Sequence, residues 1–254
     1  MQPSYKYLNS YFDKIFVLTL PALIERHKHV KTNLKGLDYE FFYGIDKNDV
    51  TMEELKNQNW YDNEVYRQYY KRPAEMLTGM LCCSIGHMKM YEYIVNNNIE
   101  KALIMEDDVV PVPAELSKLP GIMAELPVDW ELFYLGYEKN EKNNFRNKLN
   151  KLFYSAFPNH AKLKVNRQFF KRYYPRQISE NISEAGFHDC THAYALTQKA
   201  ARKMLAYGHP IRFNADNLLS FMVNTGQLKG YISSSKFFTQ LTAFINQIES
   251  LTGK

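Results

Sequence analysis

The chain has 254 residues, of which 45% are hydrophobic, 23% charged and 15% aromatic, and it carries a net charge of +5. This composition is typical of a folded protein and excludes collagen-like, low-complexity and wholly disordered chains. A chain of this length buries enough apolar surface to need no disulfide or metal for its core. The 3 cysteines form no disulfide framework, which predicts a reducing compartment.

The first ten residues do not resemble a secretory leader, because they have no basic start followed by an apolar run. The most apolar stretch, residues 15–24, is short and contains Pro21. A membrane span would need about 20 apolar residues. We therefore expect a cytoplasmic protein that contacts, at most, the inner face of a membrane.

Positive charge is concentrated in residues 139–178, which we call the basic segment. It holds 11 Lys and Arg against one acid, Glu141, whereas the rest of the chain has 21 basic and 26 acidic side chains. Aromatic residues are interspersed, so the segment is predicted to bind an anionic membrane, a phosphorylated glycan or nucleic acid. The alternative is a solvated insertion whose aromatic rings pack on the domain. No nucleic-acid-binding motif is present, so we do not expect a nucleic-acid partner.

Strands and helices are predicted to alternate along the chain. Short apolar runs predict strands at residues 15–20, 39–43, 102–105, 132–136 and 190–196. Helical spacing predicts helices at residues 24–34, 79–95, 197–208 and from about residue 214, while residues 49–71 fit neither pattern. With no repeat and no clear linker, we expect one α/β domain over residues 1–254, with a mainly parallel sheet flanked by helices.

The most informative residues are Glu106, Asp107 and Asp108, which follow the strand predicted at residues 102–105. Ligands of open α/β sheets bind beyond the carboxyl ends of the strands. Adjacent carboxylates repel one another unless a cation or hydrogen-bond donors keep them charged, and their oxygens suit Mg²⁺ or Mn²⁺. Such an ion would neutralise a diphosphate leaving group. The alternative is an acidic start to the helix predicted after Pro113.

These carboxylates belong to a longer pattern. Residues 79–87 read Gly-Met-Leu-Cys-Cys-Ser-Ile-Gly-His, and a helix, an apolar strand and Glu-Asp-Asp follow. The pattern resembles glycosyltransferase family 25, which has roughly Gly-Glu-Ile-Gly-Cys-x-x-Ser-His at this point and includes lipopolysaccharide and collagen galactosyltransferases. Weaker blocks similar to the family lie at residues 16–26, 41–46, 191–205 and 210–218. The chain departs from the pattern at Met80, Cys82 and Gly86, beside the expected donor pocket, so these positions bear on which sugar is transferred.

The resemblance implies a GT-A-like fold and a metal-dependent, inverting transferase that uses Mn²⁺ or Mg²⁺. It would move a hexose, galactose first, from a UDP-sugar donor to a glycan or lipid-linked acceptor of lipopolysaccharide or another surface glycan. The basic segment would then hold the acceptor or the membrane. Two rival functions are a nucleotidyl or phosphoryl transferase that uses the same carboxylates, and a non-catalytic module that binds anionic glycans.

By the same resemblance, Asp108 ligates the metal directly. Glu106 and Asp107 hold the nucleotide ribose and the waters on the metal, so Asp107 belongs to both the donor site and the metal site. Thr19 and Leu20, at the end of the first predicted strand, border the uracil.

Three further donor contacts are expected, each with a structural alternative. Arg26 approaches the ribose or diphosphate, or is a surface residue of the first predicted helix. Asp46 contacts the nucleotide, or caps a turn. His87 contacts the donor pocket, or packs in the core between Met88 and Met90.

Inversion requires a base that takes the proton of the acceptor hydroxyl on the side opposite the diphosphate. Asp216 matches the family carboxylate that follows the Pro210 segment, and the alternative is an ordinary acid at a helix start. Asp189 is the reserve candidate. His188 and His192 are further candidates for the metal shell or for proton transfer.

Overall fold

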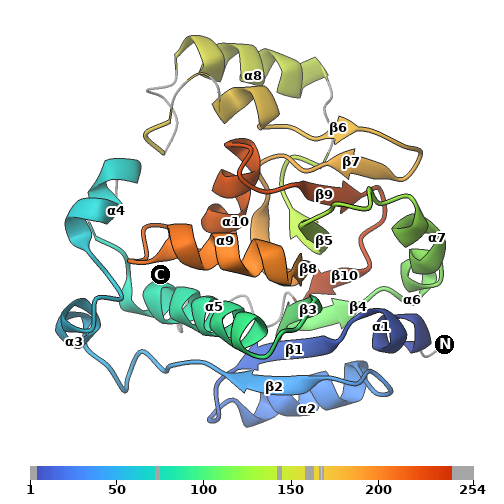
Figure 1. Cartoon of the computed structure of the whole chain (residues 1–254), viewed down its shortest axis with the longest axis horizontal. Coiled ribbons are helices and arrows are strands. Elements are labelled where there is room, and N and C mark those ends of the chain that lie inside the picture. The colour runs from blue at the N-terminus through green and yellow to red at the C-terminus, as the bar shows by residue number, and fades with distance from the viewer. Residues whose placement is uncertain are drawn as a thin grey trace.

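The computed structural model describes residues 5–71, 75–141, 145–157, 163–165, 167 and 169–241. Its centre is an eight-stranded sheet with strand order β2-β1-β3-β8-β5-β9-β7-β6 (Figure 1). The strands of this sheet are β1 (Lys14–Thr19), β2 (Glu40–Tyr43), β3 (Lys101–Glu106), β5 (Leu132–Glu138), β6 (Arg176–Gln177), β7 (Ile182–Glu184), β8 (Asp189–Thr197) and β9 (Gly230–Ser233). A separate antiparallel pair consists of β4 (Val109–Pro111) and β10 (Phe238–Gln240).

The helices cover both faces of the sheet and extend beyond one end of it. They are α1 (Lys6–Tyr11), α2 (Ile24–Asn33), α3 (Met52–Asn57), α4 (Asn63–Tyr69), α5 (Thr78–Asn96), α6 (Pro113–Leu116), α7 (Leu119–Ala124), α8 (Phe145–Ala156), the 3₁₀ helix η2 (Phe169–Arg172), α9 (Gln198–Gly208) and α10 (Ala215–Asn224). The expected α/β fold, with one large sheet flanked by helices, is confirmed.

The pairing of the strands is mixed. Parallel pairs join β1 to β2, β1 to β3 and β5 to β9, while β8 is antiparallel to both β3 and β5. The hairpin strands β6 and β7 are also antiparallel to their neighbours. The strand-helix alternation predicts parallel pairing only where a helix crosses over between two strands. β7 runs against β9, and β8 follows β7 in the same direction, so β8 runs against both β3 and β5.

Side chains of the central strands alternate between two apolar cores. On β1, Phe16 and Leu18 face a core shared with α5, α9 and α10. Ile15 and Val17 face a second core, shared with α1, α2 and α7. This period of two explains why the central strands read as continuous apolar runs, since both of their faces are buried.

The direction of β8 decides where polar residues gather. Because β8 runs against β3, the start of β8 lies beside the carboxyl end of β3, with Ala193 opposite Met105. The parallel strands β1 and β3 end at this same edge of the sheet. Residues 189–192 therefore lie beside the carboxylates at the end of β3, and Thr191 contacts Glu106.

The basic segment begins where β5 ends, and its described part contains α8, η2 and β6. Figure 1 shows α8 at the β6 end of the sheet, remote from β2. Phe169 and Phe170 are buried, and the Phe169 ring lies against Phe221 of α10 with centroids 5.8 Å apart. Some of its rings thus pack back on the domain, as one alternative expected. Residues 142–144, 158–162, 166 and 168 lie outside the described residues.

Candidate active site

A cavity of about 160 Å³ opens at the carboxyl ends of β1 and β3. Six residues expected at the donor site line it: Thr19, Leu20, Arg26, Glu106, Asp107 and Asp108. Helix α5 contributes Cys82 and Cys83, and β10 contributes Gln240. The structure therefore brings together residues that lie far apart in the sequence.

Asp107 is held by two protein donors. The Arg26 Nη1 atom lies 2.5 Å from Asp107 Oδ1, and the Thr19 hydroxyl donates to Oδ2 at 2.6 Å. Both members of the ion pair are buried, with side chains 7% and 5% exposed. Burial raises the pKa of Asp107, and the Arg26 charge opposes that shift. Arg26 is thus a buried partner of the carboxylate cluster and not a surface residue of α2.

Glu106 is held from the opposite side of the cavity. It accepts a short hydrogen bond from Thr191 of β8, and His87 Nε2 lies 3.5 Å from its Oε1 atom. Burial acts to raise the pKa of Glu106, but the His87 imidazole and the Thr191 hydroxyl outweigh burial and lower it. Glu106 is therefore anionic and adds negative charge beside Asp108.

Asp108 is the carboxylate whose charge is least compensated. Gln240 Nε2 donates to Asp108 Oδ2 at 2.8 Å, while Oδ1 is buried and has no hydrogen-bond partner among the described residues. Burial and the nearby Glu106 charge raise the pKa of Asp108 to about 7. A buried oxygen without a donor, beside two other carboxylates, fits a divalent cation. The residues present thus suit the metal that the sequence predicts.

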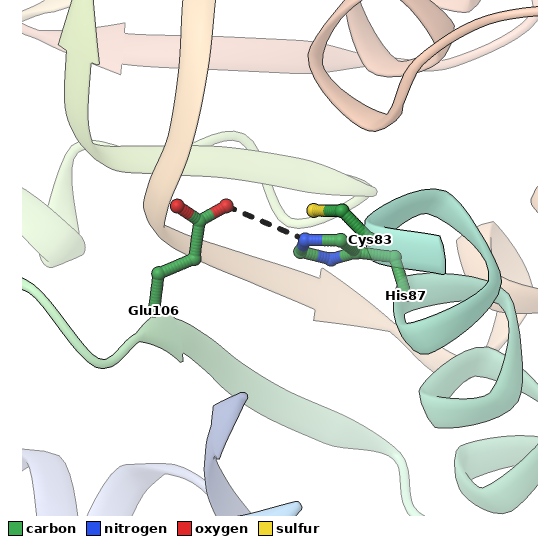
Figure 2. Close-up of side chains that lie close together, drawn as sticks. All are labelled: Cys83, His87 and Glu106. Carbon is green, nitrogen blue, oxygen red and sulfur yellow. Dashed lines mark ion pairs between the residues drawn. The ribbon is translucent and has the colours of Figure 1, made fainter. Parts of the chain in front are cut away.

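His87 lies behind Glu106 and belongs to a buried polar network. Its Nδ1 atom is 2.8 Å from the Tyr194 hydroxyl, which is 2.8 Å from the Tyr91 hydroxyl. Figure 2 shows Cys83 and His87, from successive turns of α5, on the side that faces Glu106. Cys83 was not among the site residues predicted from the sequence. The spacing of four residues on a predicted helix was the available signal, since it places both side chains on one face.

Asp216 lies in the first turn of α10, next to the start of β8. Its Oδ1 atom accepts from the Asn217 amide at 2.6 Å, and Oδ2 accepts from the Cys190 amide at 3.4 Å. The Cys190 thiol lies 3.9 Å from Gln240 Oε1, and Gln240 donates to Asp108. Burial, followed by the charge of Asp189, raises the pKa of Asp216 to about 6. Asp216 does not line the cavity; Cys190 lies between them, since its amide donates to Asp216 and its thiol contacts Gln240 in the cavity wall.

Asp189, His188 and Asp46 have structural partners, whereas neither ring nitrogen of His192 has a hydrogen-bond partner among the described residues. Asp189 forms an ion pair with Lys139. Both ring nitrogens of His188 bond to backbone groups, and burial lowers its pKa to about 4, so it is neutral. His192 is fully buried against Gly136. Asp46 accepts the Asn48 amide at 2.9 Å, as expected for a turn cap, and does not line the cavity.

A central sheet with carboxylates at a strand end, next to an acid on a helix N-terminus, defines an α/β protein with an enzyme-like polar site. The model of "Glycosyltransferase family 25 (LPS biosynthesis protein)" matches residues 12–219. The chain therefore belongs to glycosyltransferase family 25, and the recognition of this family from the sequence is confirmed.

Two similar proteins belong to animals. Procollagen galactosyltransferase 2 of Homo sapiens is 26% identical over 134 residues, which are 50% of this chain and 21% of that protein. A glycosyltransferase 25 family member of Aedes aegypti is 27% identical over 135 residues, which are 51% of this chain and 22% of that protein. The match therefore spans about a fifth of the length of these relatives.

One similar solved structure is titled "Crystal Structure of A197 from STIV". It aligns with 87% of this chain and 81% of its own chain, at 11% identity and a TM-score of 0.37.

Within the described residues, no helix has the length and apolar character that crossing a membrane would require.

The buried ion pair at Asp107 leads to a stability prediction. Arg26→Met leaves Asp107 buried without its cation, so the free energy of unfolding should fall by about 3–5 kcal/mol. The matched control is Lys28→Met, which removes an exposed pair with Glu25 on the same helix and should cost at most about 1 kcal/mol. Urea denaturation measures both. Equal losses for the two variants would contradict a structural role for the buried pair.

Proposed function

We propose that the protein transfers a hexose, galactose first, from a UDP-sugar to a glycan acceptor, with inversion at the anomeric carbon. The observation that carries this proposal is the state of Asp108. Its buried Oδ1 atom has no donor among the described residues and its pKa is raised to about 7, at a cavity beyond the carboxyl ends of two parallel strands. Membership of family 25 supports the transfer of a sugar, and the names of the relatives favour galactose.

Asp108 would hold a divalent ion, Mn²⁺ or Mg²⁺, which when bound would offset the negative charge of the departing diphosphate. Both oxygens of Asp107 are engaged by Thr19 and Arg26. Each oxygen keeps a second lone pair, so Asp107 could still contact the ion or its waters, and it also fixes the cationic Arg26 at the wall of the cavity. In that position Arg26 attracts the anionic donor.

The other donor contacts follow from the lining of the cavity. Thr19 ends β1, Leu20 follows it, and both form one wall, where a flat pyrimidine ring would pack. Glu106 forms another part of the wall and would accept hydrogen bonds from the ribose hydroxyls. His87 acts through Glu106, because it is buried behind that residue.

Asp216 would act as the base. It would take the proton of the acceptor hydroxyl while the hydroxyl oxygen bonds to the anomeric carbon and the bond to the diphosphate breaks. A pKa of about 6 suits this role, because the carboxylate is ionised at neutral pH and is more basic than an ordinary aspartate. UDP and the glycosylated acceptor are the products.

The basic segment would bind the acceptor and the membrane. A second cavity of about 580 Å³, which we call the basic cavity, is lined by Lys171, Arg172, Arg176 and Lys229. Glu184 is the one acid among the described lining residues and pairs with Arg176, while Lys229 pairs with Asp129 outside the cavity. This excess of positive charge favours a phosphate or carboxylate on the acceptor. We place the protein at the cytoplasmic face of an anionic membrane, and we treat the chain as one transferase domain with the basic segment as an insertion.

Apolar side chains on α8 support the membrane contact. Leu149, Leu152 and Phe153 recur at helical spacing, Phe157 follows the helix, and each is exposed by about half or more of its surface. A basic helix with an exposed apolar face is typical of binding at a membrane surface.

The first experiment tests the reaction and the role of Asp108. With Mn²⁺ present, the protein should release UDP from UDP-galactose, and Asp108→Asn should slow release by more than about 100-fold, because several kcal/mol of charge stabilisation are lost. The control is Asp129→Asn, an exposed aspartate outside the cavity, which should keep full activity. Pyrophosphate release from a nucleoside triphosphate would support a nucleotidyltransferase. No turnover of any UDP-sugar, with glycan binding retained in Asp108→Asn, would support a binding module.

The second experiment tests Asp216. Asp216→Asn should lower transfer by about 10²–10⁴-fold and leave UDP affinity unchanged, because the carboxylate acts only on the acceptor. Since the base must be ionised, wild-type kcat/KM should rise with pH through about 6, and the variant should lose this dependence. Near-normal transfer by Asp216→Asn, together with a loss in Asp189→Asn, would assign the base to Asp189.

The third experiment tests the membrane contact. Replacing both Leu149 and Leu152 by Asp should weaken binding to vesicles that contain anionic lipid by about tenfold or more, because two exposed leucines no longer insert. UDP release from the donor should be unchanged. Val128→Asp is the control, since Val128 is fully exposed and lies outside the basic segment. Equal binding by wild type and the double variant would leave α8 as a solvated helix.

A further inference from the structure

Three potential metal ligands of different chemistry converge beside the donor cavity. Cys83, His87 and Glu106 each offer one ligand atom, and these atoms lie within 4.8 Å of one another (Figure 2). Cys83 and His87 are four residues apart on α5, and Glu106 ends β3. The rigid elements that carry these residues keep the side chains close together without any help from a loop.

The contacts of His87 leave one ring nitrogen available. His87 is 1% exposed, and Nε2 has no hydrogen-bond partner among the described residues although it lies 3.5 Å from Glu106 Oε1. When Nδ1–H donates to Tyr194, and Tyr194 donates to Tyr91, Nε2 keeps its lone pair. A hydrogen bond of this kind on the other ring nitrogen orients histidine ligands in metal sites.

The metal-ligand atoms of this cluster differ from those at Asp108. Thiolate, imidazole and carboxylate together suit Zn²⁺, whereas Mg²⁺ and Mn²⁺ prefer oxygen ligands. Two ligands about 2.0–2.2 Å from one tetrahedral zinc ion are about 3.4 Å apart, so the spacing of His87 and Glu106 already fits. Cys83 would complete the set by a rotation of its side chain.

We propose that Cys83, His87 and Glu106 form a binding site for a thiophilic divalent cation, with Zn²⁺ the preferred ion, separate from the site at Asp108. Cys83 and Glu106 line the cavity, so the fourth position of the ion faces the cavity. Three protein ligands with an open fourth position are typical of zinc sites that exchange a ligand. This site does not depend on the transfer of a sugar, because it rests on the geometry of the three ligands.

Cobalt reports such a site directly, because a thiolate bound to Co²⁺ gives a charge-transfer band in the near ultraviolet. The full-length protein titrated with Co²⁺ should show this band, and Zn²⁺ should abolish it while Mn²⁺ should not. Cys83→Ser should remove the band and weaken Zn²⁺ binding by about 100-fold or more, since the thiolate ligand is lost. His87→Gln should also weaken Zn²⁺ binding, by at least about tenfold.

Matched variants separate this site from its neighbours. Cys82→Ser and Cys190→Ser should keep the band, because these cysteines are not in the cluster. Asp108→Asn should keep it as well, even where that variant abolishes UDP release. The proposal is overturned if wild type shows no thiolate band, if Cys83→Ser keeps the band, or if Asp108→Asn removes it.

Discussion

Negative charge buried at the end of β3 is the constraint around which this protein is organised. Two unit charges 4 Å apart interact by about 4 kcal/mol at the effective dielectric constant near a protein surface. The fold offsets this repulsion unevenly. Asp107 pairs with Arg26, and Glu106 accepts a hydrogen bond from Thr191 and lies beside His87. Among the described residues, the Asp108 carboxylate accepts a hydrogen bond only from the neutral amide of Gln240, and its pKa is raised. The residual charge at Asp108 is the reason for proposing a cation at this point of the cavity.

The antiparallel direction of β8 makes this arrangement possible. A parallel strand in that position would place its carboxyl end beside Glu106, whereas β8 brings its first residues there. Cys190 has a positive φ of 75°, which is strained for a residue with a side chain. The backbone amide of this same residue donates to Asp216. Backbone strain at the start of β8 is therefore stored where the predicted base is positioned.

The sequence predicted the apolar central strands, α5, α9 and the start of α10, because their hydrophobic spacing has one interpretation. It also predicted that the three carboxylates belong to the site, because three adjacent acids directly after a buried strand are unusual. It did not predict that Arg26 is buried or that Gln240 reaches Asp108, because both contacts join segments more than 80 residues apart. The partners of Asp46 and His188 were likewise decided by turn and loop geometry, for which the hydrophobic pattern holds no signal.

Helix α10 connects the two charged regions of the molecule. Its first turn carries Asp216, while Val223, near its other end, lines the basic cavity. Ten residues of helix span about 15 Å, so an anionic group in the basic cavity lies about one helix length from the predicted base. An acceptor that carries its charge several bonds away from the reacting hydroxyl could contact both ends at once. An acceptor whose charge adjoins that hydroxyl could not, because the same charge would then lie among the carboxylates of the cavity. The separation of the two regions therefore favours an extended, anionic glycan as the acceptor of the proposed transferase.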